Sequence, residues 1–213
     1  MPNWDKQHHI YHQEDWIDKP SIFAQWVINY FPNSGSLIDL GGGQGQDSRF
    51  FSGLGYKTTL VDYSDVALYY FEKKSDLETR NKIVNIKHDL GKPFPLHDES
   101  YDIVYSHLAL HYFDVNTTHQ IFNEIYRILK PNGIFTALLN STADPKYYEK
   151  KLNKQGLIKD NDLLKRFFNL DNIQPFISKF QTILLDNNGE TYKDRAIGTK
   201  NLIRYVGEKQ FSS

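Results

Sequence analysis

Two aspartates flank four glycines in the segment Leu37-Ile-Asp-Leu-Gly-Gly-Gly-Gln-Gly-Gln-Asp47. An apolar run that ends in an acid and is followed at once by glycines is typical of a buried strand that leads into a tight turn. Because glycine has no Cβ, the backbone of such a turn can approach a ligand closely. Polar residues follow, as at the start of a helix. The segment therefore predicts a strand, a turn and a helix that hold a nucleoside-containing ligand.

Two common phosphate-binding motifs do not fit this turn. A Walker-type loop ends in Gly-Lys-Ser/Thr, and the chain has no such sequence. The dinucleotide fingerprint needs a third small residue, and Gln46 occupies that position. The spacing instead resembles the first motif of class I S-adenosylmethionine-dependent methyltransferases. This resemblance implies that S-adenosyl-L-methionine is the cofactor and that it is bound by Asp39, Gly41, Gly42, Gly43 and Gly45.

The resemblance extends to later segments, in the order that the family has them. Leu60-Val-Asp62 ends the second predicted strand, where the family places an acid that binds the ribose diol, although dehydrogenases also have an acid there. His88-Asp-Leu90 resembles the position that meets the adenine amino group. Residues 94–112 and 125–134 are similar to the fourth-strand region and to the passage into the fifth strand. The further cofactor contacts implied are Asp62, Tyr63, Asp89, Leu90, Ser106 and His107.

Alternating strands and helices are predicted to position these residues. We expect strands at 36–40, 57–61, 83–87, 101–106 and 133–140, and helices at 21–31, 46–52, after Ser64 and at 116–129. This order predicts a parallel sheet whose ligands lie at the carboxyl ends of its strands. The resemblance implies an α/β fold: a Rossmann-like, doubly wound, seven-stranded sheet, mostly parallel with an antiparallel last strand, and helices on both faces.

The length of 213 residues favours one domain, 1–213. We divide it into an N-terminal lid or helix (1–31), a cofactor-binding core (36–141), a variable substrate-cap insertion (142–179) and a final β-hairpin (180–213). Within the insertion, residues 162–179 are predicted to form one or two helical pieces, around 166–168 and 172–177. Strands are predicted at 180–185 and 201–206, and the residues 186–189 are predicted to form a turn.

Composition restricts the setting of the protein. The formal net charge of −1 gives no general field for nucleic acid, although a local patch stays open. The chain has no cysteine, which removes disulfides and thiolate chemistry. The polar N-terminus lacks the apolar core of a signal peptide, and no apolar run reaches the ~18 residues of a membrane span. We therefore expect a soluble, cytoplasmic protein without a membrane partner.

His107 and His111 are candidates for catalysis. Four residues apart, they could share one helix face as metal ligands, but without a nearby glutamate or third ligand a packed or capping pair is the preferred interpretation, and no metal is expected. Either could act as a general base, yet family members often use none, so the catalytic residue stays open. A solvated or lid-forming role is expected for His8, His9 and His12, and a solvated face for Lys146, Lys150, Lys151, Lys154 and Lys159.

The methyl acceptor is the least determined part of the prediction. Family members that methylate exocyclic base amines often carry Asn/Asp-Pro-Pro-Phe/Tyr after the fourth strand, and this chain has Ser106-His-Leu-Ala109. We favour a small molecule, methylated at O, N or S and enclosed by the N-terminal segment and residues 141–179. RNA or protein acceptors, and a non-catalytic subunit, are the alternatives. The aromatic residues there suit either an aromatic acceptor or ordinary packing: Trp4, Tyr11, Trp16, Tyr147, Tyr148, Phe167 and Phe168.

Overall fold

A seven-stranded sheet forms the centre of the computed structural model, which describes residues 4–144, 147–148, 152–153, 157–160, 163–192 and 200–210. The strand order is β3-β2-β1-β4-β5-β9-β8. Strands β1 to β5 are parallel, and β9 is antiparallel to β5 and β8. The predicted sheet with its antiparallel last strand is confirmed. The strands are β1 (Ser36–Leu40), β2 (Lys57–Asp62), β3 (Ile83–Lys87), β4 (Tyr101–His107), β5 (Leu129–Leu139), β8 (Gln181–Gly189) and β9 (Leu202–Glu208).

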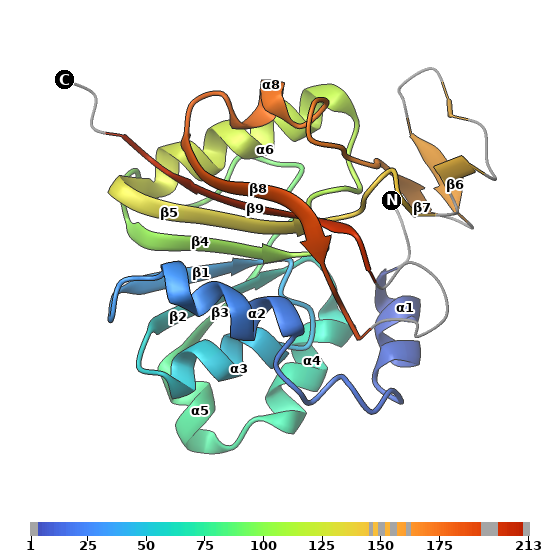
Figure 1. Ribbon diagram of the computed structural model, residues 1–213. Coiled ribbons are helices and arrows are strands. Elements are labelled where there is room, and N and C mark those ends of the chain that lie inside the picture. The colour runs from blue at the N-terminus through green and yellow to red at the C-terminus, as the bar shows by residue number, and fades with distance from the viewer. Residues whose placement is uncertain are drawn as a thin grey trace.

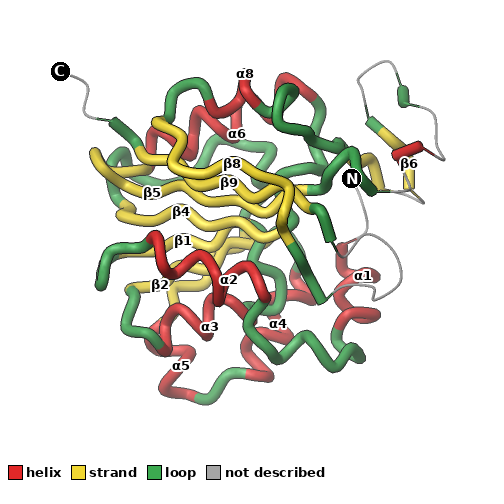
Figure 2. Tube along the Cα trace, in the orientation of Figure 1, coloured by secondary structure: helices red, strands yellow, loops and turns green. Residues whose placement is uncertain are grey.

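Helices cover both faces of this sheet, as the ribbon and the tube show (Figure 1, Figure 2). Successive strand residues point to opposite faces, so β1 contributes to two hydrophobic clusters. Ile38 and Leu40 pack with α6 and α8, whereas Leu37 packs with α2 and α3. The helices are α1 (Trp4–Tyr11), α2 (Ile22–Val27), η1 (a 3₁₀ helix, Ile28–Tyr30), α3 (Gln46–Gly53), α4 (Asp65–Lys74), α5 (Leu77–Lys82), α6 (Val115–Ile128) and α8 (Gln174–Ile177).

Side-chain caps fix where several helices begin. The oxygens of Ser21, Ser64, Asp76 and Asp114 each accept a hydrogen bond from the backbone N–H three residues further on. Such caps satisfy amide groups that have no partner within the helix. The helix predicted after Ser64 is confirmed, and the cap at Ser64 places the start of α4 directly after β2.

Several element boundaries differ from the prediction. The helix predicted at 21–31 is α2 followed by the 3₁₀ turn η1. Helix α1 lies within the region 1–31 predicted as a lid or helix, and α5 was not predicted. The fifth strand begins at Leu129 rather than at 133, because β5 already pairs with β4 there. Strand β8 continues through the predicted turn at 186–189, where its pairing with β9 shifts register instead of ending.

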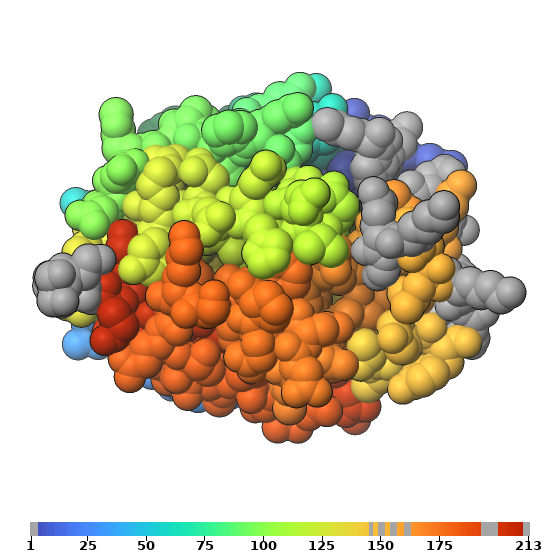
Figure 3. Space-filling model, turned by 90° about the horizontal axis from the view of Figure 1, so that it is seen from above, coloured from blue at the N-terminus to red at the C-terminus, as the bar shows by residue number. Residues whose placement is uncertain are grey.

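The helix predicted around residues 166–168 is wrong. Strand β7 (Leu163–Lys165) pairs with β6 (Ile158–Asp160) in a separate two-stranded sheet. The backbone N–H groups of Arg166 and Phe168 then donate to the distant carbonyls of His111 and Asn140, so they make no helical hydrogen bonds. The second predicted piece is the short α8. Seen from above, the chain that leads from β7 to α8 lies beside α6 (Figure 3).

No helix in the described part of the chain is long and apolar enough to cross a membrane. Of the predicted lysine face, Lys159 is exposed. Lys146, Lys150, Lys151 and Lys154 lie outside the described residues.

Candidate active site

The glycine turn begins where β1 ends, at the point where the chain order of the sheet reverses between β1 and β4. Gly41 and Gly43 have φ angles of 72° and 57°, which side chains with a Cβ rarely adopt. A Cβ on Gly41 would lie 2.3 Å from the Cβ of Ala109. The N–H groups of Gly41 and Gly42 both donate to the carbonyl of Val61, at 2.8 and 3.1 Å. The turn is therefore fixed against β2 and the β4–α6 connection.

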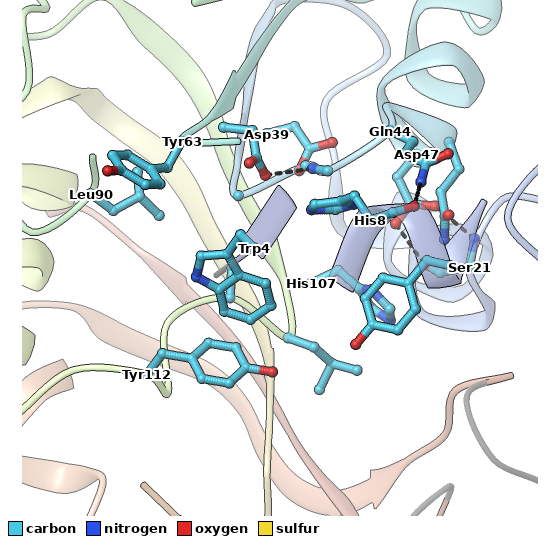
Figure 4. Close-up of a pocket in the computed structure, with 18 of the residues that line it drawn as sticks. Trp4, His8, Ser21, Asp39, Gln44, Asp47, Tyr63, Leu90, His107 and Tyr112 are labelled. Carbon is cyan, nitrogen blue, oxygen red and sulfur yellow. Dashed lines mark hydrogen bonds between the residues drawn. The ribbon is translucent and has the colours of Figure 1, made fainter. Parts of the chain in front are cut away.

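A cavity of about 390 Å³ opens above this turn (Figure 4). Its volume is within the range of about 300–1,000 Å³ that small-molecule sites have. Among the predicted cofactor contacts, the cavity is lined by Asp39, Gly41, Gly42, Gly43, Asp62, Tyr63, Asp89, Leu90 and His107. Most of the predicted cofactor contacts therefore lie around one cavity.

Gly45 and Ser106 do not line the cavity. Gly45 precedes α3 with a φ of 72°, and a Cβ there would lie 2.5 Å from Cδ2 of Phe71. The hydroxyl of Ser106 donates to the carbonyl of Leu40 at 2.9 Å, which joins β4 to β1. Both residues thus support the glycine turn through contacts with the protein interior and not through the cavity.

His107 and His111 do not share a helix face, because no helix forms between β4 and α6. His107 ends β4 and lines the cavity. His111 is buried, and its Nδ1 lies 3.4 Å from the backbone N–H of Asn140. Within the described residues, no group of three or more His, Cys, Asp or Glu side chains could hold a metal ion. Of the two histidines, His107 is the one placed to meet a ligand.

Asp39 is a buried carboxyl group beside the glycine turn, with 1% of its surface exposed. Its Oδ2 accepts a hydrogen bond from the hydroxyl of Ser48 at 2.7 Å, while its Oδ1 has no hydrogen-bond partner in the described part of the chain. Burial, reinforced by the charges of Asp47 and Asp62, raises the pKa of Asp39 to about 8. The site is therefore suited to a ligand that brings positive charge or hydrogen-bond donors to Asp39.

Asp47, in the first turn of α3, holds three segments of the chain together. Its Oδ1 accepts from the N–H of Ser21 at 2.6 Å, and its Oδ2 accepts from the hydroxyls of Ser21 and Tyr105 at 2.8 and 2.6 Å. Burial, reinforced by the charges of Asp47 and Asp39, holds the pKa of Tyr105 well above its usual value, so this hydroxyl stays a donor. The position of Asp47 in the glycine segment was the available signal for this network, but its partners are distant in sequence.

Replacing Tyr105 with Phe is expected to lower the free energy of unfolding by about 1–3 kcal/mol, because the buried Asp47 loses a hydrogen-bond donor. Urea denaturation followed by circular dichroism measures this change. Tyr69→Phe is the control, since Tyr69 is more than half exposed and lies outside the network. Equal stabilities of the two variants would contradict the assignment.

Backbone amides hold the other two acids. Asp62 Oδ2 accepts from the N–H of Gly43 at 2.8 Å, and its Oδ1 accepts from the N–H of Ser64 at 2.9 Å. Asp89 Oδ1 accepts from the N–H of Gly91 at 2.9 Å. A carboxylate oxygen has a second lone pair available for a ligand hydroxyl or amine. Both acids are therefore oriented before any ligand binds.

Helix α1 lies over the glycine turn. The His8 ring is so close to Gly43 that a Cβ there would lie 3.0 Å from His8 Cε1, and the Gln44 side-chain amide donates to the His8 carbonyl at 2.9 Å. Trp4 makes an edge-on contact with Tyr112, their ring centroids 4.6 Å apart. Figure 4 shows Trp4 and His8 directed into the cavity.

Aromatic side chains form much of the remaining cavity lining, namely Trp4, Tyr11, Trp16, Tyr112, Phe113 and Tyr192. Among the described residues of 142–179, none lines the cavity. Tyr147 instead contacts Phe167, and Phe168 contacts Phe176 in the core. The aromatic wall thus comes from the N-terminal segment, the β4–α6 connection and the chain after β8.

Comparisons with known proteins agree with this geometry. Residues 38–137 match a family model described as a methyltransferase domain. The mRNA-capping enzymes of African swine fever virus are 26% identical over 222 residues, which covers 90% of this chain but only 26% of theirs, so the chain spans about a quarter of the length of these relatives.

Two solved structures share the fold. An S-adenosylmethionine-dependent methyltransferase from Methanosarcina mazei has a TM-score of 0.74 at 18% identity, over 87% of this chain and 97% of its own. The 1,6-didemethyltoxoflavin-N1-methyltransferase of Burkholderia thailandensis, solved with bound 1,6-didemethyltoxoflavin and S-adenosylhomocysteine, has a TM-score of 0.74 at 13% identity, over 98% of this chain and 86% of its own.

Proposed function

We propose that this chain, whose residues 38–137 match a methyltransferase domain, is a class I S-adenosylmethionine-dependent methyltransferase that acts on a small, planar, uncharged acceptor. The observation that carries the proposal is one cavity lined by two kinds of residue. The glycine turn and its acids would bind the methyl donor, and the aromatic side chains would hold the acceptor.

The residues present fit the donor. Glycine is needed at position 42 for the turn to pack over Asp39, since a Cβ there would come within 2.5 Å of Asp39 Oδ2. The buried Oδ1 of Asp39 still lacks a hydrogen-bond partner in the described residues. When bound, S-adenosyl-L-methionine supplies a methyl carbon made electrophilic by a positively charged sulfur. We assign its ribose to Asp62, its adenine to Asp89, Leu90 and Tyr63, and its cationic groups to the region of Asp39.

Alignment is the main contribution that the chain itself makes to the reaction. The turn and the acids are fixed by backbone hydrogen bonds, and the Gln44 side chain fastens α1 to the glycine turn. Holding two reactants in line can lower a barrier by about 7–11 kcal/mol. The rigid turn and its covering helix are the parts suited to this task.

The acceptor class rests on the character of the aromatic wall. Flat rings favour stacked or edge-on contacts with a planar ligand. The charged side chains among the described residues that line the cavity are the carboxylates of Asp39, Asp47, Asp62 and Asp89, which border the glycine turn, and the exposed Lys92. An uncharged planar molecule suits this lining. The Burkholderia protein, named for N1-methylation of 1,6-didemethyltoxoflavin, has the same fold.

An RNA acceptor is the second candidate, favoured by the similarity to viral mRNA-capping enzymes over 90% of this chain. The net charge of −1 supplies no general attraction for RNA. Binding of RNA whose affinity falls steeply with salt would favour this candidate, and absence of binding at low salt would remove it.

Thermal stabilisation by S-adenosylmethionine and S-adenosylhomocysteine tests donor binding. A ligand at about 100 times its dissociation constant adds roughly 2.7 kcal/mol of stability, so no shift with either compound would overturn the proposal. Labelled S-adenosylmethionine offered with pools of planar small molecules, RNA and protein then identifies the acceptor. Donor binding without transfer to any pool would indicate a non-catalytic subunit.

His107 is the residue of the chain best placed to accept a proton from the acceptor, because it ends β4 at the cavity. His107→Gln is expected to lower kcat about 100-fold or more for an acceptor whose attacking atom carries a proton. The control His97→Gln alters an exposed residue distant from the cavity lining. An unchanged pH profile of kcat in His107→Gln would remove the general-base assignment.

A further inference from the structure

We propose that Asp5 of helix α1 is a positioning residue for the carboxylate of Asp62, so that docking of α1 strengthens the binding of the donor's ribose. The inference rests on the proposed function, which assigns Asp62 to the ribose. Asp5 belongs to the short N-terminal helix, whereas Asp62 ends β2 at the centre of the fold. Ser64 connects the two acids.

Two hydrogen bonds of Ser64 form this connection. Its hydroxyl donates to Asp5 Oδ1 at 2.6 Å, and its backbone N–H donates to Asp62 Oδ1 at 2.9 Å. The same hydroxyl accepts from the N–H of Ala67 at 3.0 Å as the cap of α4. A hydroxyl has one proton. Because the hydroxyl donates this proton in its hydrogen bond to Asp5, its lone pairs are directed toward α4. The backbone of Ser64 is thereby held in one orientation.

Asp5 reinforces the start of α4 in a second way. Its Oδ1 also accepts from the N–H of Val66 at 3.3 Å, an amide in the first turn of that helix. The hydrogen bond from Ser64 is the largest cause that lowers the pKa of Asp5, which keeps this carboxylate charged at neutral pH. Hydrogen bonds to a charged acceptor are stronger than neutral ones. Ser64 itself is buried, with 1% of its surface exposed.

Helix α1 also contacts the residue that holds the other oxygen of Asp62. Asp62 Oδ2 accepts from the N–H of Gly43, and the ring of His8 lies against Gly43. The Gln44 amide fastens the backbone of α1 to the same turn. Both donors to the Asp62 carboxylate, Gly43 and Ser64, are therefore held by one helix that the sequence places far away.

Calorimetry with two ligands tests this coupling: S-adenosylhomocysteine and its 2′,3′-dideoxyribose analogue. Asp5→Ala is expected to weaken the binding of S-adenosylhomocysteine about three- to tenfold, the effect of a lost hydrogen bond. It should weaken the binding of the dideoxy analogue less than about twofold. Asp5→Asn keeps an oxygen that accepts the same hydrogen bonds, so its affinities should stay within about twofold of wild type.

The matched control is Asp18→Ala. Asp18 also fastens the N-terminal segment, through Lys74 and Arg49, but does not touch Ser64. We expect Asp18→Ala to change the affinities of the protein for the two ligands by the same factor. Equal losses for both ligands in Asp5→Ala, or no loss for either, would overturn the inference. A wild-type protein that binds neither ligand would overturn the proposed function and this inference with it.

Discussion

Asp39→Asn should weaken the binding of S-adenosylmethionine by about tenfold or more, and at the same time raise the melting temperature of the ligand-free protein near pH 8. The affinity falls because a buried acceptor that can carry a negative charge is replaced by a neutral amide, and hydrogen bonds to charged groups are worth about 1.5–3 kcal/mol. The amide oxygen can still accept the hydrogen bond of Ser48. The stability rises because the folded protein no longer has to ionise a buried carboxyl.

The pH dependence of stability follows from the raised pKa of Asp39, about 8 against an ordinary 3.8. Between these values the folded state keeps a proton that the unfolded state has released, so stability falls as pH rises. This contribution is complete below pH 3.8 and is lost by pH 8. The stability gain of Asp39→Asn over wild type should therefore grow from pH 4 to pH 8 and then level off.

The affinity for the donor should show the opposite trend. The cationic groups of S-adenosylmethionine favour ionised Asp39, so binding below pH 8 releases a proton and tightens as pH rises toward 8. Asp39→Asn should remove this trend in calorimetric titrations. Asp76→Asn, a change of an exposed cap of α5, is the control for both measurements. If Asp39→Asn changed neither the affinity for S-adenosylmethionine nor its dependence on pH, Asp39 would have no part in the donor site.

Gly41→Ala is expected to have the second large effect, a loss of about 3 kcal/mol or more of stability together with the loss of donor binding. A residue with a Cβ at positive φ costs roughly 1–2 kcal/mol, and forcing atoms into a packed region adds about 1–3 kcal/mol. The new Cβ would lie 2.3 Å from the Cβ of Ala109, which cannot rotate away. The β4–α6 connection would have to move, and the cavity lining with it.

Gly55→Ala separates the conformational cost of a positive φ from the cost of the steric clash. Gly55 also has a positive φ, 95°, but no atom lies within 4 Å of the place that a Cβ would take. This variant should show the conformational cost alone and keep donor binding. Chemical denaturation and thermal shift with S-adenosylhomocysteine measure both effects. Equal stability losses in the two variants would contradict the steric explanation.

The parts of the site that could be predicted from the sequence are those that neighbouring residues determine. A buried strand, a glycine turn and the start of a helix follow one another within Leu37–Asp47, so local residue types indicate the turn and Asp39 directly. Asp62 and Asp89 follow strands in the same way. Their places around one cavity then follow from the parallel sheet.

The remainder depends on contacts between distant segments. Helix α1 has no regular apolar face, and it is held by Asp5 on Ser64 and by His9 on Tyr70. The network of Asp47 joins Ser21 to Tyr105 on one face of the sheet, and nothing in the sequence pairs these residues. The same reason explains the wrong helix at 166–168, whose amides donate to carbonyls of other elements.

The position of α1 has a consequence for the rate of turnover. With His8 against Gly43, the part of a bound ligand that crosses the glycine turn cannot leave over Gly43 while the helix is docked. We expect exchange of spent for fresh donor to require undocking of α1, and such lid motions take microseconds to milliseconds. We therefore expect release of S-adenosylhomocysteine, rather than methyl transfer, to set the steady-state rate, with a burst of methylated product in the first turnover.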